Sequence, residues 1–257
     1  SGSVGSAQSI CYNTSPSQLT ELAPPTGGTG SYTFQWQSSP NNSTWSNITG
    51  ATSSAYSPSA LTNSTYYRRN VTSGSCGTIS SASFLITVFP NLTSGSIGSA
   101  QTVCYNATPA GLTQLTAPTG GTGSYTFQWQ SSPDNSTWSN ITGATSSTYS
   151  PGVLTASTYY RRNVTSGSCG TVSTASILIT VRAILTPGSV GSPQTICYNS
   201  TPSGLTQLSA PTGGTGTYTY QWQSSPDNNT WTNISGATSS AFSPGTLTTS
   251  TYYRRNV

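Results

Sequence analysis

The sequence contains no lysine, no histidine and no methionine, and only three of its side chains are carboxylates. General acid–base catalysis needs a group that titrates near the working pH, usually histidine, lysine or a carboxylate. The three acids, Glu21, Asp134 and Asp227, lie far apart in the sequence, so no stretch offers the carboxylate pair of a glycosidase. Serine and threonine are abundant but have no base to activate them. These absences predict that the chain is not an enzyme.

Charge is also scarce, at 4% of residues against about 25% in ordinary soluble domains. The net charge of +4 comes from seven arginines, which are too thinly spread for a nucleic-acid surface. Zinc sites need histidine or paired cysteines, and calcium sites need several carboxylates, so we expect no metal and no cofactor. No apolar run approaches the roughly twenty residues of a membrane-spanning segment. We therefore expect neither nucleic acid nor a membrane span.

What the sequence does contain is a repeat of 93 residues. Cys11, Cys104 and Cys197 recur at this interval, and the stretch SYTFQWQSSP at Ser31 recurs unchanged at Ser124. The motif TYYRRNV appears three times, starting at Thr65, Thr158 and Thr251. A period of this length is one domain rather than one hairpin. It predicts tandem domains produced by duplication.

Aligning the chain with itself predicts the domain boundaries. Repeat 1 covers residues 1–88, repeat 2 covers 94–181 and repeat 3 covers 187–257. Joints of about five residues leave little free swivel, so we expect a semi-rigid rod. Repeat 3 stops at Val257 and lacks the last strand of the other two, which leaves an open sheet edge. We expect a slice of a longer array, with a strand supplied by a neighbour as the alternative.

Within each repeat the pattern is that of short strands. Tyr125, Phe127 and Trp129 alternate with polar residues, which predicts one aromatic face and one polar face. Residues 157–165 and 172–181 read as the last two strands. About seven short strands in about ninety residues are typical of an immunoglobulin-like sandwich. The predicted fold class is therefore all-β, with tandem Ig-like β-sandwich domains.

The five cysteines follow the same repeat. Cys11 and Cys76 fall in repeat 1, and Cys104 and Cys169 fall in repeat 2, so we expect one disulfide inside each. Cys197 would then pair with a residue beyond the end of the chain. Disulfides of this kind indicate an oxidising, extracellular compartment.

Two sets of tryptophans and three arginine pairs are the remaining candidate site residues. Trp36, Trp129 and Trp222 lie mid-strand and are predicted to be core. A second set follows a turn, and either packs at the rim or offers a stacking platform to a sugar. Neighbouring arginines on one strand point to opposite faces, so one of each pair is a candidate contact, either stacked on an aromatic ring or facing an anion. The second tryptophan set and these arginines are Trp45, Trp138, Trp231, Arg68, Arg161 and Arg254.

The motifs ICYNTSPSQL, GGTGSYTFQWQSS, W-x-N-I-x-G-A-T and TYYRRNVTSGSCG, closed by an ITV strand, carry a resemblance. They resemble the Ig-like and PKD-like repeats of giant cell-surface proteins of Bacteroidota, a group that includes gliding-motility adhesins of the SprB type. The resemblance covers every repeat. It implies export by the type IX secretion system and a stalk or adhesive filament outside the cell. It does not by itself assign one function, because one fold carries many.

Three functions are consistent with this interpretation. The favoured one is a non-catalytic, disulfide-stapled stalk in surface adhesion or gliding motility, with neighbouring repeats of the same chain or filament as partners. The second is a multivalent module that binds surface glycans or a substratum and gains avidity from repetition. The third is an accessory spacer of a large secreted hydrolase.

Overall fold

The computed structural model describes all residues 1–257, and every regular element is a strand apart from two single-turn 3₁₀ helices, η1 (Gly74–Cys76) and η2 (Gly167–Cys169). The chain groups into two compact units, residues 1–99, 111–149 and 159–177, and residues 100–110, 150–158 and 178–257. The first unit contains repeat 1 and the joint after it. The second contains the joint after repeat 2 and all of repeat 3. No helix here has the length and apolar character to cross a membrane.

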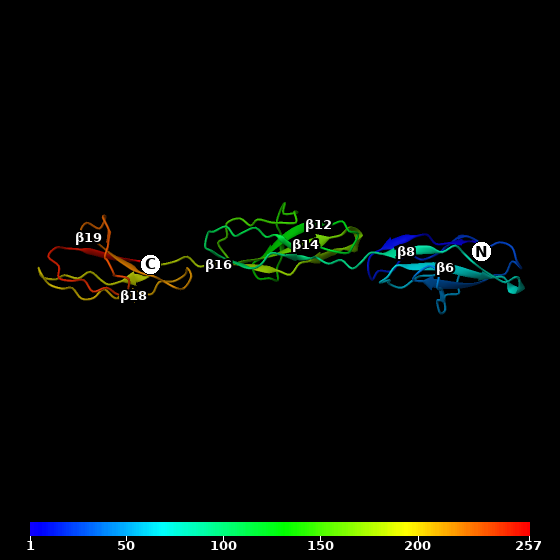
Figure 1. The fold of residues 1–257 in the computed structure, drawn as a ribbon, viewed down its shortest axis with the longest axis horizontal. Helices are drawn as coiled ribbons and strands as arrows, with labels where there is room; N and C mark the ends of the chain where they lie inside the picture. The colour runs from blue at the N-terminus through cyan, green and yellow to red at the C-terminus, as the bar shows by residue number, and fades with distance from the viewer. The chain divides into compact units, whose positions relative to one another are not determined.

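The larger sheet of repeat 1 has five strands in one path. In this path the closing strand β8 (Phe84–Val88) lies between β2 (Gln8–Ile10) and β6 (Thr65–Thr72). Strand β2 runs parallel to β8, and β6 runs antiparallel to it. A sixth strand, β7 (Thr78–Ser80), also pairs with the central strand. The path is β2 (Gln8–Ile10), β8 (Phe84–Val88), β6 (Thr65–Thr72), β4 (Thr33–Ser39) and β5 (Ser46–Asn47). Figure 1 shows β6 and β8 together in this repeat.

The second layer of repeat 1 is shorter. Strand β1 (Ser3–Val4) pairs antiparallel with β3 (Glu21–Ala23), and Leu19 and Tyr56 form an isolated bridge beside them. A short sheet that faces a larger one built around β4, β6 and β8 is the arrangement of an immunoglobulin-like sandwich. The predicted all-β, Ig-like fold is confirmed.

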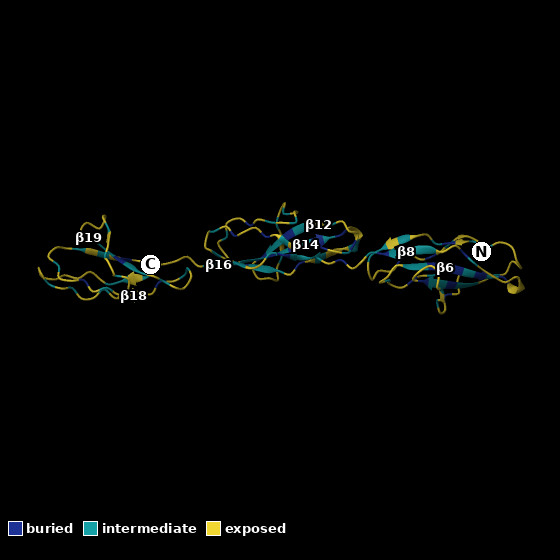
Figure 2. Ribbon diagram, in the orientation of Figure 1, coloured by how far each residue is buried: buried dark blue, intermediate teal, exposed yellow.

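The core between the layers is built from few, large side chains. Trp36 on β4, Leu19 and Ile86 are fully buried. The ring of Tyr56 lies 6.0 Å from that of Trp36 and 6.1 Å from that of Tyr67, so the aromatic side chains form a continuous row. The indole N–H of Trp36 donates to the Ser53 carbonyl at 3.0 Å, which satisfies its one polar atom. Figure 2 shows the buried positions along β6 and the exposed connecting loops.

Repeat 2 has the same strand order. Its larger sheet runs β10 (Gln101–Cys104), β16 (Ile177–Arg182), β14 (Thr158–Thr165), β12 (Thr126–Ser132) and β13 (Ser139–Asn140), with β15 (Thr171–Ser173) beside β14. Its second sheet pairs β9 (Ser96–Ile97) with β11 (Gln114–Thr116). The sequence predicts one strand over 172–181, but the structure breaks it. The Thr174 hydroxyl accepts from the Arg162 N–H at 3.0 Å and so replaces a backbone ladder bond at the break.

Repeat 3 has fewer strands than the other two repeats. It has the pair β17 (Ser189–Val190) and β18 (Gln207–Ser209) and a three-stranded sheet, β20 (Thr232–Asn233), β19 (Gln221–Ser225) and β21 (Tyr252–Asn256). No strand follows β21, and residues 194–196, which correspond to β2, are not in a strand. The two absences are linked, because in repeat 1 strand β2 pairs with the closing strand β8.

Candidate functional site

The joint between repeats 1 and 2 is the most tightly built feature outside the cores. The Gly-rich loop of repeat 2 packs its backbone against the linker, and the Gly121 N–H donates to the Pro90 carbonyl at 2.8 Å. Thr93 and Thr119 exchange backbone hydrogen bonds, and their hydroxyls lie 2.7 Å apart. The linker is thus paired along its length rather than free.

Glycine is required in this loop by the close approach of two backbones. Gly120 has a φ of 75°, and a Cβ built on it would overlap the carbonyl oxygen of Asn91. The corresponding Gly27 of repeat 1 has no linker packed against it, and a Cβ added there would meet nothing within 4 Å. The Gly-rich loop therefore serves the joint, since only glycine combines the positive φ with this contact.

A disulfide crosses the same joint. It joins Cys11 of repeat 1 to Cys169 of repeat 2, with their Cα atoms 5.2 Å apart. Cys11 opens a turn that follows β2, in which the Thr14 hydroxyl donates to the Cys11 carbonyl at 2.7 Å. Cys169 belongs to η2, which connects β14 to β15. Cys76, Cys104 and Cys197 are free and exposed.

This pairing corrects the prediction of one disulfide inside each repeat. In repeat 1, Cys11 follows Ile10, which pairs with Val88 near the start of β6, whereas Cys76 lies beyond the end of β6. Eight residues of β6 span about 26 Å at roughly 3.3 Å per residue. Bridged cysteines have Cα atoms within about 7 Å. The two cysteines of one repeat therefore lie at opposite ends of a sheet.

The second joint repeats the backbone contacts of the first without its disulfide. The Gly214 N–H donates to the Ala183 carbonyl at 2.9 Å, and Thr186 pairs with Thr212. Cys104 occupies the place of Cys11 but is free. Beside it is a cavity of about 440 Å³, whose wall includes Leu185 and Tyr218.

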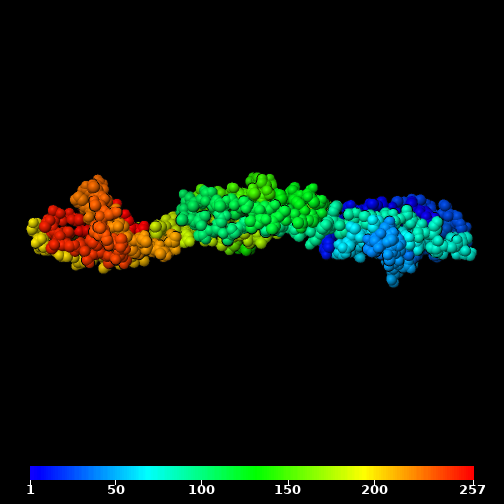
Figure 3. Space-filling model, in the orientation of Figure 1, coloured from blue at the N-terminus to red at the C-terminus, as the bar shows by residue number.

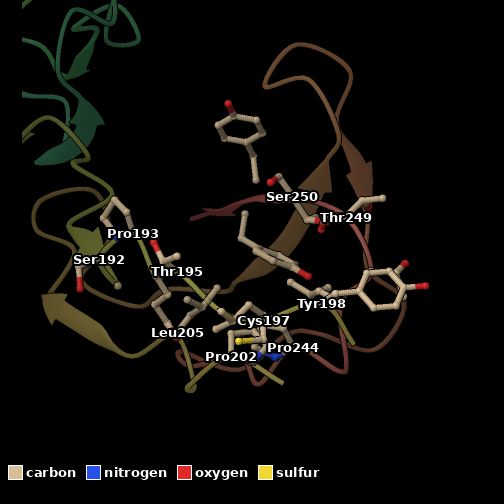
Figure 4. A pocket seen from close by; sticks show the side chains of 18 of the residues that line it. Ser192, Pro193, Thr195, Cys197, Tyr198, Pro202, Leu205, Pro244, Thr249 and Ser250 are labelled. Carbon is tan, nitrogen blue, oxygen red and sulfur yellow. The ribbon is translucent and has the colours of Figure 1, made fainter. Parts of the chain in front are cut away.

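Repeat 3 also carries an open groove of about 660 Å³. It lies where the closing strand lies in the other repeats, between the segment around Ile196 and the start of β21. Figure 4 shows Leu205, Pro202, Pro244 and Cys197 along one wall. The lining combines apolar side chains with serine and threonine hydroxyls beside an unpaired strand edge, which is the geometry that accepts an added strand.

The arginine that faces outward in each repeat stacks on the second tryptophan. The guanidinium of Arg68 lies 4.2 Å from the ring centroid of Trp45, and its Nε donates to Gln37 at 2.7 Å. Gln37 in turn donates to Asn47 at 2.8 Å. The other repeats reproduce this cluster with Arg161, Trp138, Gln130 and Asn140, and with Arg254, Trp231, Gln223 and Asn233. Figure 3 shows the β4–β5 hairpin beside this cluster projecting from repeat 1.

The arginine that faces inward is buried. Arg69 is fully buried, donates to Glu21 and to the Ser54 carbonyl, both at 2.7 Å, and lies 4.3 Å from the ring of Phe34. In repeat 2 the partner of Arg162 is the neutral Gln114, at 2.9 Å. Burial lowers the pKa of Arg162, because a low dielectric disfavours the charged form. Its Nε has no hydrogen-bond partner, so ring contact is the remaining compensation at that atom.

The first tryptophan of each repeat and the carboxylates complete the candidate residues. Trp36, Trp129 and Trp222 are fully buried in the cores. Asp134 accepts from the backbone N–H groups of Thr137 and Ser136, which hold its pKa well below the usual range. Asp227 is held in the same way in repeat 3. No group of three or more His, Cys, Asp or Glu side chains is placed to hold a metal ion.

The sequence predicts short, stiff joints but not the contacts that hold them. The strand order points to the disulfide, because β2 runs parallel to β8 and places Cys11 beside the linker. The glycines are a second signal, since the TGG stretch recurs at the same position in all three repeats. Neither signal can be interpreted before the sandwich topology is assigned.

A protein-family model described as a domain of unknown function, DUF8696, matches residues 1–90, 93–183 and 186–257. No curated protein matches the sequence. Among solved structures, the titin I-band fragment I67–I69 is 11% identical with a TM-score of 0.49, covering 99% of this chain and 92% of that one. The three N-terminal domains of the bacteriophage RB49 outer capsid protein Hoc are 14% identical with a TM-score of 0.37, covering 96% and 84%. Likeness at this level carries no functional information, and the predicted boundaries of the three domains stay a prediction.

Proposed function

The chain belongs to the DUF8696 family over all three of its repeats, and we propose that it is a non-catalytic segment of an extracellular protein that acts as a stalk with stiffened joints. The joint between repeats 1 and 2 carries this proposal. A flexible tether needs no contacts between its domains, whereas this joint combines paired backbones, obligatory glycines and a disulfide.

The physical consequence is a restricted hinge. The linker hydrogen bonds hold the Gly-rich loop of repeat 2, and the Cys11–Cys169 bond adds a covalent tie between the two repeats beside the linker. The two attachments together oppose bending more strongly than either alone, because bending must then distort the disulfide as well as break the backbone pairing. A stalk that holds a binding tip away from a surface requires this property.

The finer assignment is a cell-surface adhesin or filament with a role in adhesion or gliding motility, exported by type IX secretion. It is supported by the repeated motifs that resemble the giant surface proteins of Bacteroidota. The disulfide supports an extracellular location, since such bonds persist in oxidising compartments. The low charge supports contacts that depend little on salt.

A second candidate is weak, multivalent binding of glycans. It is supported by the outward-facing arginine–tryptophan cluster, whose tryptophans are partly buried and which recurs in all three repeats with the same stacking distance of 4.2 Å. An aromatic ring with neighbouring amide donors suits a sugar, and three copies would gain avidity. Glycan binding by the chain that disappears in Trp45→Ala, Trp138→Ala, Trp231→Ala together would support this candidate, and an inert wild type would remove it.

The stalk is tested at the first joint. Nuclear magnetic relaxation on the oxidised chain reports whether repeats 1 and 2 tumble as one body. We expect a shared correlation time in the wild type and separate, shorter ones in Cys11→Ser, further shortened when Gly120→Ala is added. Cys76→Ser is the control, because it removes an exposed thiol outside the joint. Independent tumbling of repeats 1 and 2 in the wild type would contradict the proposal.

A further inference from the structure

Three cysteines are free beside the one disulfide, and Cys104 lines the cavity at the second joint. It lies 93 residues after Cys11, at the end of β10, in the same turn sequence Cys-Tyr-Asn. At the first joint the corresponding cysteine is bonded to the Ser-Gly-Ser-Cys-Gly turn of the following repeat. At the second joint, residues 1–257 contain no corresponding turn.

The first joint shows what fills this space. There the Ser166 hydroxyl, just before η2, accepts from the Thr122 N–H at 2.9 Å and donates to the Ser124 carbonyl at 3.0 Å. The turn also covers the linker, so that Leu92 is only 8% exposed. At the second joint the equivalent Leu185 is 46% exposed and lines the cavity beside Cys104. The cavity at the second joint therefore takes the place that the turn around η2 takes at the first joint.

The groove in repeat 3 and the cavity beside Cys104 correspond to two parts of one segment of repeat 2. In repeat 2 one segment, residues 165–182, supplies first η2, then β15, and finally β16. We call it the closing segment. Its first part pairs with the end of β14 through Thr165 and Thr171, and in repeat 1 the corresponding last strand pairs with the start of β6. In repeat 3 the cavity adjoins Val257 just after β21, and the groove adjoins Tyr252 and Tyr253 at its start.

We propose that the second joint and repeat 3 together form an acceptor site for a closing segment, a Ser-Gly-Ser-Cys-Gly turn followed by a strand of alternating apolar residues, and that Cys104 traps it as a disulfide. The turn occupies the cavity beside Cys104, and the strand lies along the free edge of β21 and covers Leu205. This goes beyond the stalk function, because it assigns a partner to a site that is open in this chain. It also predicts that every joint in an array of such repeats is stapled between repeats.

The covalent step is thiol–disulfide exchange. The Cys104 thiol and the thiol of the incoming turn are oxidised to one disulfide, and oxidised glutathione accepts the two electrons and two protons to give two glutathione thiols. Docking of the turn raises the local concentration of its thiol at Cys104 only. Cys76 lies outside the acceptor site. Cys197 lines the groove, but by analogy with Cys11 of repeat 1 it lies near the end of the docked strand, so the thiol of the turn is not brought beside it.

The test uses the 257-residue chain and a synthetic peptide with the sequence of residues 165–182, in a glutathione redox buffer. Mass spectrometry of the non-reduced digest locates the peptide. We expect the adduct at Cys104 to exceed those at Cys76 and Cys197 by roughly tenfold or more, as an effective-concentration effect requires. Cys104→Ser should abolish the selective adduct, whereas Cys76→Ser, outside the acceptor site, should leave it unchanged.

Two peptide variants separate docking from thiol chemistry. A peptide with Cys169→Ser should still bind without a bond and should slow hydrogen exchange in β21. A peptide with Ile177→Asp and Ile179→Asp keeps its cysteine but cannot enter the apolar groove, so its labelling should become equal at the three thiols. Equal labelling by the unmodified peptide, or no adduct at all, would overturn the acceptor site. Neither result would alter the stalk test, which concerns the Cys11–Cys169 joint alone.

Discussion

Repeats 1 and 3 place nearly the same residues at the same positions, yet their interiors differ. Leu19 in repeat 1 is fully buried, whereas the equivalent Leu205 is only partly buried and lines a groove. Tyr67 is 3% exposed, and its counterpart Tyr253 is again only partly buried. The difference follows from one segment, because β8 covers these side chains in repeat 1 and nothing replaces it in repeat 3. The hydrophobic pattern thus selects the core residues, and the closing segment determines whether they are buried.

Completing repeat 3 should have the largest effect on its stability. A chain extended after Val257 by the sequence of residues 165–182 would complete repeat 3. Burying each additional isoleucine or leucine contributes about 1.5–3 kcal/mol, so we expect repeat 3 to gain at least about 3 kcal/mol. Hydrogen exchange on peptides unique to each repeat measures the gain. Repeats 1 and 2 serve as the internal control, and a repeat 3 that stays as weakly protected as before would contradict the comparison.

Truncating one equivalent leucine in repeats 2 and 3 tests how much the closing segment adds to the burial of a single side chain. Leu112→Ala in repeat 2 should cost about 2–5 kcal/mol, since Leu112 is 1% exposed and its removal leaves a cavity. Leu205→Ala in repeat 3 should cost less than half as much, because water already reaches this side chain through the groove. Denaturant titration followed by exchange in each repeat measures both. Equal losses would show that the groove is closed in solution.

How far the sequence alone predicts this molecule depends on the range of each interaction. The alternation around Trp36 is local, so it predicts which face of the strand is buried. The same alternation says that Arg68 and Arg69 point to opposite faces, but it does not say which one enters the core. That depends on a partner 48 residues away, which is Glu21 for Arg69 and Gln114 for Arg162. Cys11 and Cys169 are 158 residues apart, and their bond needs the orientation of two domains.

The buried arginine offers a smaller, reciprocal contrast between repeats 1 and 2. Arg69 has the carboxylate of Glu21 as its partner, whereas Arg162 has the amide of Gln114. Hydrogen bonds between charged groups contribute about 1 kcal/mol more than those of neutral partners. We therefore expect Gln114→Glu to stabilise repeat 2 by about 1 kcal/mol and Glu21→Gln to destabilise repeat 1 by a similar amount. Denaturant midpoints resolved by repeat would test this, and two changes of the same sign would refute it.

The smallest expected effect concerns acid. In repeats 2 and 3 the turn after the long strand is held by Asp134 and Asp227, and in repeat 1 by Asn41, which accepts from Ser43 and Thr44 at 3.0 and 2.9 Å. Hydrogen bonds from the backbone lower the folded-state pKa of Asp134 below its unfolded value of about 3.9. The stability that this carboxylate contributes is therefore complete above about pH 5 and is lost as the pH falls through about 4 and below.

Exchanging Asp134 and Asn41 separates the acid sensitivity caused by the turn carboxylate from that of the other carboxyl groups. Asp134→Asn keeps the turn, as Asn41 does in repeat 1, but leaves no charge to neutralise. We expect repeat 2 of this variant to lose less protection between about pH 6 and about pH 2.5 than the wild type does, and Asn41→Asp to make repeat 1 more acid-sensitive. The Asp134 carboxylate is solvent-exposed, so salt should reduce the difference between the acid profiles of the variant and the wild type. Unchanged acid profiles in both variants would mean that the turn is held by its backbone bonds whether or not the side chain is charged.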